Sequence, residues 1–228
     1  MKKLLEIFFI VLVLLVANAC LFFFWWILTE PSNYLWESVS TDREYKVMNA
    51  CSKIFWNRYY TWSLVINLLT FSFLFYYVNK VVSLSLTALA GVVYLISWFF
   101  FDPYVAKNYV IIFESQQVSN SFLTEPIKQG GTMTGSILLE RIADSNYPRR
   151  YYAIKALGEI RYSPAAEPLG KILLNGKETE KIRGASYIAL KAIRSDLSRK
   201  YLLLFSQLVL KNEKDRQVIQ RLEKENAY

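Results

Sequence analysis

Long hydrophobic runs dominate the first hundred residues of the chain. Residues 4–28 contain only Glu6 and Asn18 as strongly polar side chains, and a helix of this length covers about 37 Å. The hydrocarbon core of a bilayer is about 30 Å thick, so this run predicts a transmembrane helix. Residues 62–78 and 84–101 carry no charge and have the length of short spans. The pattern therefore predicts three transmembrane helices, the last two paired as a hairpin.

The segment between the first two spans has a different character. Residues 29–61 hold four acidic and four basic residues among several aromatic ones. Two interpretations stay open here, an amphipathic helix on the membrane surface or a small extramembrane loop packed on itself and on the helix ends. Cys51 lies in this segment and Cys20 within the first span, so we expect no disulfide between them.

The N-terminal sequence also has features of a cleaved lipoprotein signal, with a basic start and a hydrophobic stretch before Cys20. The hydrophobic run continues past that cysteine, which favours an uncleaved anchor. Lys2 and Lys3 precede the first span while acidic residues follow it, and this favours a cytoplasmic N-terminus and an exported C-terminal half. A count of basic residues in the short loops favours the reverse orientation. We expect a multi-pass protein of the cytoplasmic membrane.

Asn18 and Asn67 are candidate interhelical contacts within the membrane. The second and third spans contain no ionisable residue, whereas a substrate path normally needs such groups facing a cavity. Hydrogen bonds between helices are the commoner role of isolated polar side chains in a span. A transport or channel function would require several copies of the chain.

Charged residues are concentrated in the second half. Of 27 basic and 19 acidic residues, 7 and 5 precede Asp102. The chain has no histidine and two cysteines, which excludes histidine-ligated metals, Ser-His and Cys-His nucleophiles and four-cysteine clusters. We therefore predict no catalytic residue, no metal, no cofactor and a non-catalytic protein.

Residues 102–134 are predicted to be a linker. Gly130, Gly131 and Gly135 indicate a flexible hinge, because no phosphate-loop pattern accompanies them. The apolar patch 109–113 is compatible with either a strand or a helical turn.

The predicted C-terminal domain, residues 135–228, contains a repeat. RYYAIKALGEI at 150–160 and RGASYIALKAI at 183–193 are offset by 33 residues, and each follows another amphipathic run, at 137–143 and 165–174. This spacing predicts stacked helix pairs. Ser163-Pro164 is typical of a helix start and Asn175-Gly176 of a helix end. A third, degenerate pair follows at 197–210 and 213–225.

The sequence YAIKALGEIRYSPAAEPLGKILLN resembles HEAT repeats of the short variety first associated with phycobilisome lyases. The second copy is similar except that Lys191 stands where the pattern has glycine, and the third departs from it. The resemblance covers about 90 of 228 residues and implies a short α-solenoid of two to three helix pairs. The predicted fold class is all-α, with three transmembrane helices followed by this solenoid.

Arg150, Arg183 and Arg216 recur at the 33-residue offset. Two interpretations stay open: a ladder of partner-binding residues for an acidic surface, or hydrogen bonding within the stack, as in HEAT-like repeats. The tail from Asp102 has a net charge of +6, but its bases are spread without a strip of interleaved aromatic residues, so we predict no nucleic-acid partner.

The sequence favours a membrane-anchored scaffold or accessory subunit that binds a protein partner. The partner would be an integral-membrane enzyme, a transporter or a secretion assembly, and the bilayer would be the second contact. One alternative is a lyase-type chromophore-handling enzyme, with Glu140, Glu159 and Glu167 as scattered candidate acids. The other is a subunit of an oligomeric transporter or channel.

Overall fold

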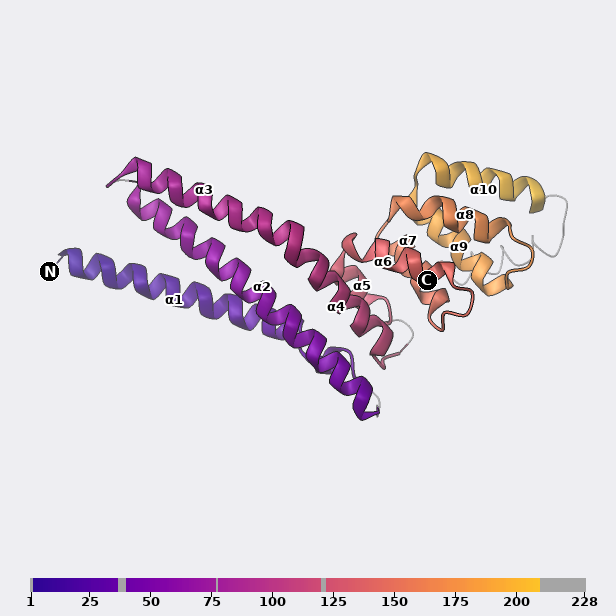
Figure 1. The fold of residues 1–228 in the computed structure, drawn as a ribbon, viewed down its shortest axis with the longest axis horizontal. Helices are drawn as coiled ribbons and strands as arrows, with labels where there is room; N and C mark the ends of the chain where they lie inside the picture. Colours follow the sequence, from indigo (N-terminus) through magenta and orange to yellow (C-terminus); the bar gives the residue numbers. More distant parts are fainter. Residues whose placement is uncertain (1, 37–39, 77, 120–121, 210–228) are drawn as a thin grey trace. The chain divides into compact units, whose positions relative to one another are not determined.

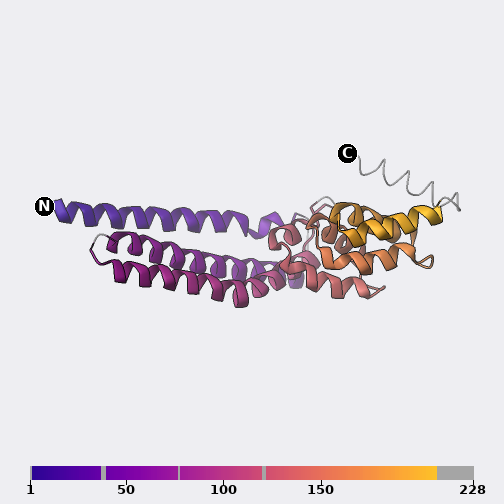
Figure 2. The same cartoon turned by 90° about the horizontal axis from the view of Figure 1, so that it is seen from above.

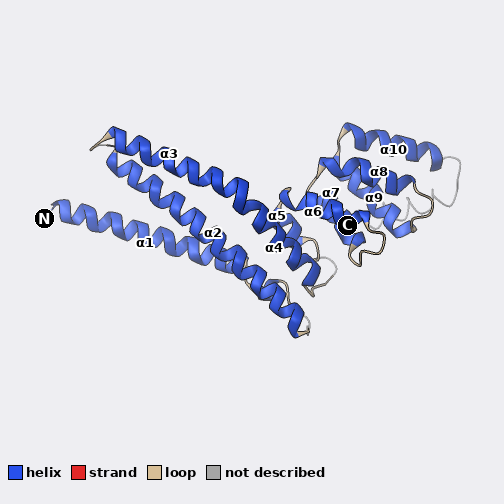
Figure 3. Cartoon of the chain, in the orientation of Figure 1, coloured by secondary structure: helices blue, strands red, loops and turns tan. Residues whose placement is uncertain are grey.

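Helices make up nearly all of the computed structural model, which describes residues 2–36, 40–76, 78–119 and 122–209. Within these ranges no β-strand occurs, and the only extended pairing is one isolated parallel bridge between Leu35 and Gln117 (Figure 3). The predicted all-α class is confirmed. The chain divides into two compact units, unit 1 (Met1–Val118) and unit 2 (Ser119–Tyr228).

Unit 1 is built from long helices (Figure 1). In chain order they are α1 (Lys2–Leu28), a short 3-10 turn (Pro31–Asn33), α2 (Thr41–Phe75), α3 (Lys80–Ile96), a π-helical turn (Ser97–Phe101) and α4 (Asp102–Ser115). Helix α3 continues through the π turn into α4, so the two helices form one extended rod. Helix α2 packs against α1, α3 and α4.

The direction of the three long helices follows from the residues that they bring together. The α1–α2 pairs are Asn18 with Asn67 and Phe22 with Phe55, and the α2–α3 pairs are Ser72 with Ser83 and Trp62 with Tyr94. In both sets, residues later in one helix contact residues earlier in the other. Helix α2 therefore runs antiparallel to α1 and to α3. Helices α1 and α3 therefore run in the same direction (Figure 2).

Two helices among the described residues are long and apolar enough to cross a membrane, not the three predicted. They cover Phe8–Asn33 and Lys80–Ser115. The predicted span 62–78 is wrong as a separate element, because it forms the second part of the 35-residue α2, whose first part is charged. Helix α2 also ends at Phe75, and Asn79 then caps α3 by accepting hydrogen bonds from the backbone N–H groups of Val81 and Val82. The uncharged part of α2, residues 59–75, is therefore at the lower limit of the length that can span a membrane.

A compact core joins the first part of α2 to α4. Its buried members are Tyr34, Val47, Ala50, Cys51, Ile54, Val105, Tyr109 and Ile112. Residues 41–61 are therefore helical, and their apolar side chains pack on α4. The patch 109–113, left open between strand and helix, is helical.

Unit 2 consists of short helices. They are α5 (Glu125–Gly130), α6 (Met133–Ala143), α7 (Arg150–Glu159), a 3-10 turn (Ser163–Ala165), α8 (Ala166–Leu174), α9 (Glu180–Ile193) and α10 (Asp196–Val209). Helix α6 packs on α7, α8 on α9, α7 on α9, and α10 on both α8 and α9. The predicted linker 102–134 contains α4 and α5, and the predicted helix 213–225 with Arg216 lies outside the described residues.

Helix ends in unit 2 follow local chemistry. Thr179 caps α9, since its side-chain oxygen accepts a hydrogen bond from the Ile182 N–H at 3.4 Å, and α9 ends at Arg194 in the left-handed conformation. Ser163 was predicted to cap a helix, but its side chain makes no capping bond because Ser163–Ala165 form a 3-10 turn before α8. Asn175 does end α8, as predicted.

Glycines allow the helices of unit 2 to approach one another. A Cβ atom on Gly158 of α7 would lie 2.6 Å from the Ala189 Cα of α9, so any larger side chain would require the two helices to shift. A Cβ atom on Gly135 would lie 2.4 Å from the Tyr162 ring. Gly135 is therefore a packing residue of α6, and its assignment to a flexible hinge is wrong.

Candidate functional site

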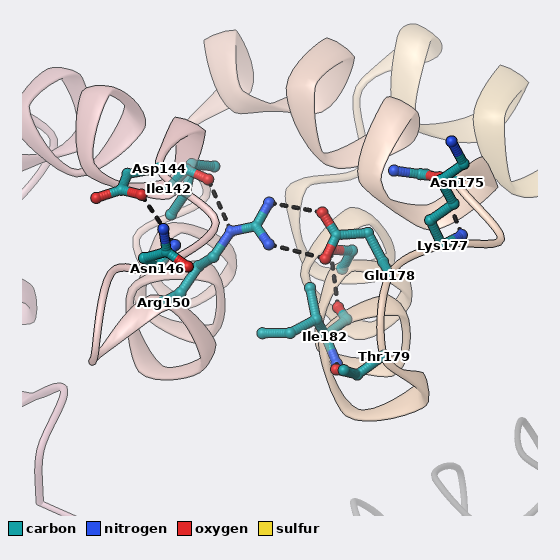
Figure 4. A network of polar contacts seen from close by, with 10 residues as sticks. Ile142, Asp144, Asn146, Arg150, Asn175, Lys177, Glu178, Thr179 and Ile182 are labelled. Carbon is teal, nitrogen blue, oxygen red and sulfur yellow. Dashed lines mark hydrogen bonds and ion pairs between the residues drawn. The ribbon is translucent and has the colours of Figure 1, made fainter.

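Arg150, at the start of α7, lies at the centre of a polar network (Figure 4). Its Nε donates a hydrogen bond to the Ile142 carbonyl at 2.8 Å, and its two terminal nitrogens donate to the two oxygens of Glu178, each at 2.8 Å. The residue is only 7% exposed. This bidentate arrangement uses the planar fork of the guanidinium, which a lysine cannot reproduce.

Arg183 makes the equivalent contact one repeat later. Its Nε donates to the Leu173 carbonyl at 3.0 Å, and its guanidinium lies 5.5 Å from the centre of the Phe205 ring. Ile142 and Leu173 are each the penultimate residue of the preceding helix, α6 and α8. Arg150 and Arg183 therefore have the same structural role.

Each of these two arginines caps the C-terminal end of the preceding helix. The last carbonyls of a helix lack partners within it and carry the negative end of the helix dipole, so a cation placed there satisfies both needs. Glu178, in the loop between α8 and α9, offsets the charge of Arg150 and ties α7 to the following pair. The network binds one helix pair to the next, and a role for Arg150 or Arg183 in partner binding stays a prediction.

In unit 1, Asn18 and Asn67 lie together between α1 and α2. The Asn18 amide donates to the Asn67 side-chain oxygen at 3.0 Å and to its own helix at the Leu14 carbonyl at 2.8 Å. Ser63 completes the cluster, since its hydroxyl donates to the Asn18 side-chain oxygen and accepts from the Asn67 amide. The sequence interpretation named both asparagines but missed Ser63, which lies one helical turn before Asn67 and so shares its face.

A second polar cluster joins α2 to α3. The buried hydroxyl of Ser72 donates to the Ser83 carbonyl at 2.8 Å and lies 2.7 Å from the Thr87 hydroxyl. Arg58 and Asp102 form a half-buried ion pair between α2 and the first residue of α4, directly after the π turn. Together these contacts join α2 to the α3–α4 rod near the C-terminal end of α2 and in its middle.

A pocket of about 240 Å³ opens where α1 ends against the first part of α2. Trp26, Met48 and Phe55 supply apolar walls, and Glu30 and Ser52 supply polar groups. The Cys51 thiol lies at the same place, 2% exposed. Burial raises the pKa of this thiol from its ordinary 9.0 to about 12, and the nearby Glu30 carboxylate adds to the shift. Cys51 therefore stays protonated, which is the form unsuited to a nucleophile or a metal ligand.

The candidate acids of a lyase-type site are not assembled. Glu159 lies 3.5 Å from Lys128 and 4.0 Å from Lys155, whereas Glu167 pairs with Lys171 on the exposed face of α8. Glu140 is exposed on α6. Among the described residues, no group of three metal-ligating side chains occurs.

Comparisons with protein-family models, with curated proteins and with solved structures give no match to this chain. Its function is therefore inferred from the arrangement of its own residues.

Proposed function

We propose that the protein is a membrane-anchored scaffold or accessory subunit. The observation that carries this proposal is the exposure of its apolar helices. Within the most apolar 18-residue stretches of Phe8–Asn33 and Lys80–Ser115, 0% and 11% of the residues are buried. The core helix of a soluble protein is mostly buried, whereas a helix that exposes its whole apolar surface has lipid as its natural solvent.

We further propose that α2 crosses the membrane between these two helices, giving three spans. Helices α1 and α3 run in the same direction, so a chain that crosses with both must return between them. The second part of α2 also exposes apolar side chains, including Leu64, Leu69 and Phe73. Its pairing with α3, closed by the Ser72 cluster, lets the hairpin cross as one body.

Unit 2 is proposed to be a HEAT-like solenoid. The support is that successive helix pairs contact their neighbours and that Arg150 and Arg183 cap equivalent helices. Repeat stacks of this kind present extended surfaces that bind proteins. The proposed partner is a subunit of an integral-membrane enzyme, transporter or secretion assembly, held beside the anchor.

The proposed location is the cytoplasmic membrane, with a cytoplasmic N-terminus and an exported unit 2. The basic residues Lys2 and Lys3 before the first span support this orientation. The orientation can be tested directly by treating spheroplasts with protease when the protein carries a tag at its C-terminus. Digestion of the tag from outside supports the orientation, and full protection contradicts it.

Co-purification tests the scaffold function itself. Full-length tagged protein is extracted in a mild detergent and its associated proteins are identified. Leu157→Asp, which places a charge in the core of unit 2, should remove a partner held by that unit. Leu203→Asp is the matched control, because Leu203 is 65% exposed on α10. A protein that always purifies alone, or a partner set unchanged by Leu157→Asp, would contradict the proposal.

A further inference from the structure

The pocket between α1 and α2 has a defined chemistry. Its walls are apolar, and Glu30 is the one ionisable carboxylate that lines it. Among the described residues, Glu30 has no ion-pair partner. A half-buried carboxylate beside an indole ring favours a cation, because the carboxylate accepts charge-assisted hydrogen bonds and the ring face attracts positive charge.

The pocket also has a defined place along the chain. It lies where the apolar part of α1 ends, next to Trp26, and tryptophans are typical of the headgroup level of a bilayer. Phe23 and Ile27, one turn before and directly after this position, are 55% and 66% exposed. Phe23 extends the apolar surface of α1 from the pocket rim toward the hydrocarbon core, and Ile27 adds exposed apolar surface at the rim itself. A molecule seated here would have its polar end at Glu30 and an apolar part along α1.

We infer that this pocket binds the headgroup of a phospholipid that carries a primary ammonium, with its acyl chains along the exposed face of α1. The inference rests on the proposed membrane location of α1. A primary ammonium has three donors, which suits the Glu30 carboxylate. The Ser52 hydroxyl, exposed at the same rim, is a donor for the phosphate.

A primary ammonium is preferred to a quaternary one for a structural reason. Quaternary ammonium groups are recognised by cages of several aromatic rings, whereas this pocket offers Trp26 and Phe55 with the carboxylate and a hydroxyl. An anionic headgroup without an amine would bring its negative charge to Glu30 and be repelled. The expected order is phosphatidylethanolamine above phosphatidylcholine, with phosphatidylglycerol weakest.

The test is lipid retention by the full-length protein in detergent. Purified protein is mixed with equimolar phosphatidylethanolamine, phosphatidylcholine and phosphatidylglycerol, and bound lipid is counted by native mass spectrometry. We expect at least about fivefold more ethanolamine than glycerol lipid on the wild type. Glu30→Gln should bring the two close to parity, and Ser52→Phe should lower total bound lipid by filling the pocket. Glu44→Gln is the matched control, since Glu44 is an exposed acid elsewhere on α2.

Three outcomes would overturn the inference: equal retention of the glycerol lipid by the wild type, equal retention of the choline lipid, or an ethanolamine preference that survives Glu30→Gln. Circular dichroism checks that Glu30→Gln, an isosteric change at a partly exposed residue, keeps its helices. Carbonate extraction of membranes separates this question from the proposed function. Wild-type protein released by carbonate would contradict the membrane anchor, whereas retained protein without lipid preference contradicts only the pocket.

Discussion

Units 1 and 2 are both helical, yet they place polar and apolar side chains in opposite ways. Away from the apolar core between α2 and α4, unit 1 exposes large apolar residues along α1 and α3 and puts amide and hydroxyl groups between its helices, as at Asn18 and Ser72. Unit 2 buries leucines and alanines between its helices and exposes most of its charge. The contrast is the one expected if, as proposed, α1 and α3 lie in lipid and unit 2 lies in water. In lipid the face that holds helices together is polar or small, and in water it is apolar.

The largest expected effect comes from a charge in the apolar core of unit 2. Leu157 is 0% exposed between α7 and its neighbours. Leu157→Asp should destabilise unit 2 by more than about 5 kcal/mol, because it loses a buried side chain and leaves an unpaired carboxylate. Pulse proteolysis of the full chain measures the unfolding of unit 2. All six tryptophans precede Asp102, so tryptophan fluorescence reads unit 1. Loss of both signals together would contradict the division into two units.

Removal of the buried arginine fork should have the next largest effect. Arg150→Ala leaves Glu178 and the Ile142 carbonyl without a buried partner, at a cost of about 3 kcal/mol or more. Arg150→Lys should recover only part of this, since lysine lacks the fork. Urea midpoints from pulse proteolysis measure the change. Arg199→Ala is the control, because the Arg199–Asp196 pair is 70% and 98% exposed and should contribute little. Equal midpoints for the Arg150→Ala and Arg199→Ala variants would exclude a capping role.

Close helix contact in unit 2 can be tested at a glycine. Gly158→Ala puts a Cβ atom against the Ala189 backbone of α9 and should cost about 1–3 kcal/mol. Gly176→Ala is the matched control, as nothing lies within 4 Å of its added Cβ. The difference between the two urea midpoints measures the contact. A Gly158→Ala variant as stable as wild type would mean that α7 and α9 are farther apart than described.

The sequence was more informative for unit 2 than for unit 1. The 33-residue offset indicates which residues occupy equivalent positions in successive helix pairs. Arg150 and Arg183 recur at this offset because each caps the helix before it. Unit 1 has no such period, and hydrophobic runs reveal which residues prefer lipid but not where a helix begins. Residues 62–78 look like an isolated span, yet α2 starts at Thr41 because its charged first part buries Val47 and Ile54 against α4.

The candidate site residues also differed in how easily the sequence revealed them. Asn18 and Asn67 were evident as rare polar groups in apolar runs, while their partner Ser63 looked like an ordinary residue of the second run. The Glu30 pocket left no pattern in the sequence, since its walls come from two helices separated by a turn. Glu178 was hidden as well, because nothing local relates a loop carboxylate to an arginine 28 residues earlier.

The smallest predicted effect tests the polar contacts of unit 1. Asn67→Leu removes the hydrogen bond between α1 and α2 and should destabilise the helix assembly by about 1 kcal/mol, the usual worth of such a bond in a membrane. Thr70→Val is the matched control, because the Thr70 hydroxyl bonds only to the Ile66 carbonyl of its own helix. Unfolding in sodium dodecyl sulfate, followed by tryptophan fluorescence, measures both variants. A Thr70→Val loss as large as that of Asn67→Leu would mean that the contact between helices adds nothing, and the contrast between the two units would then rest on apolar exposure alone.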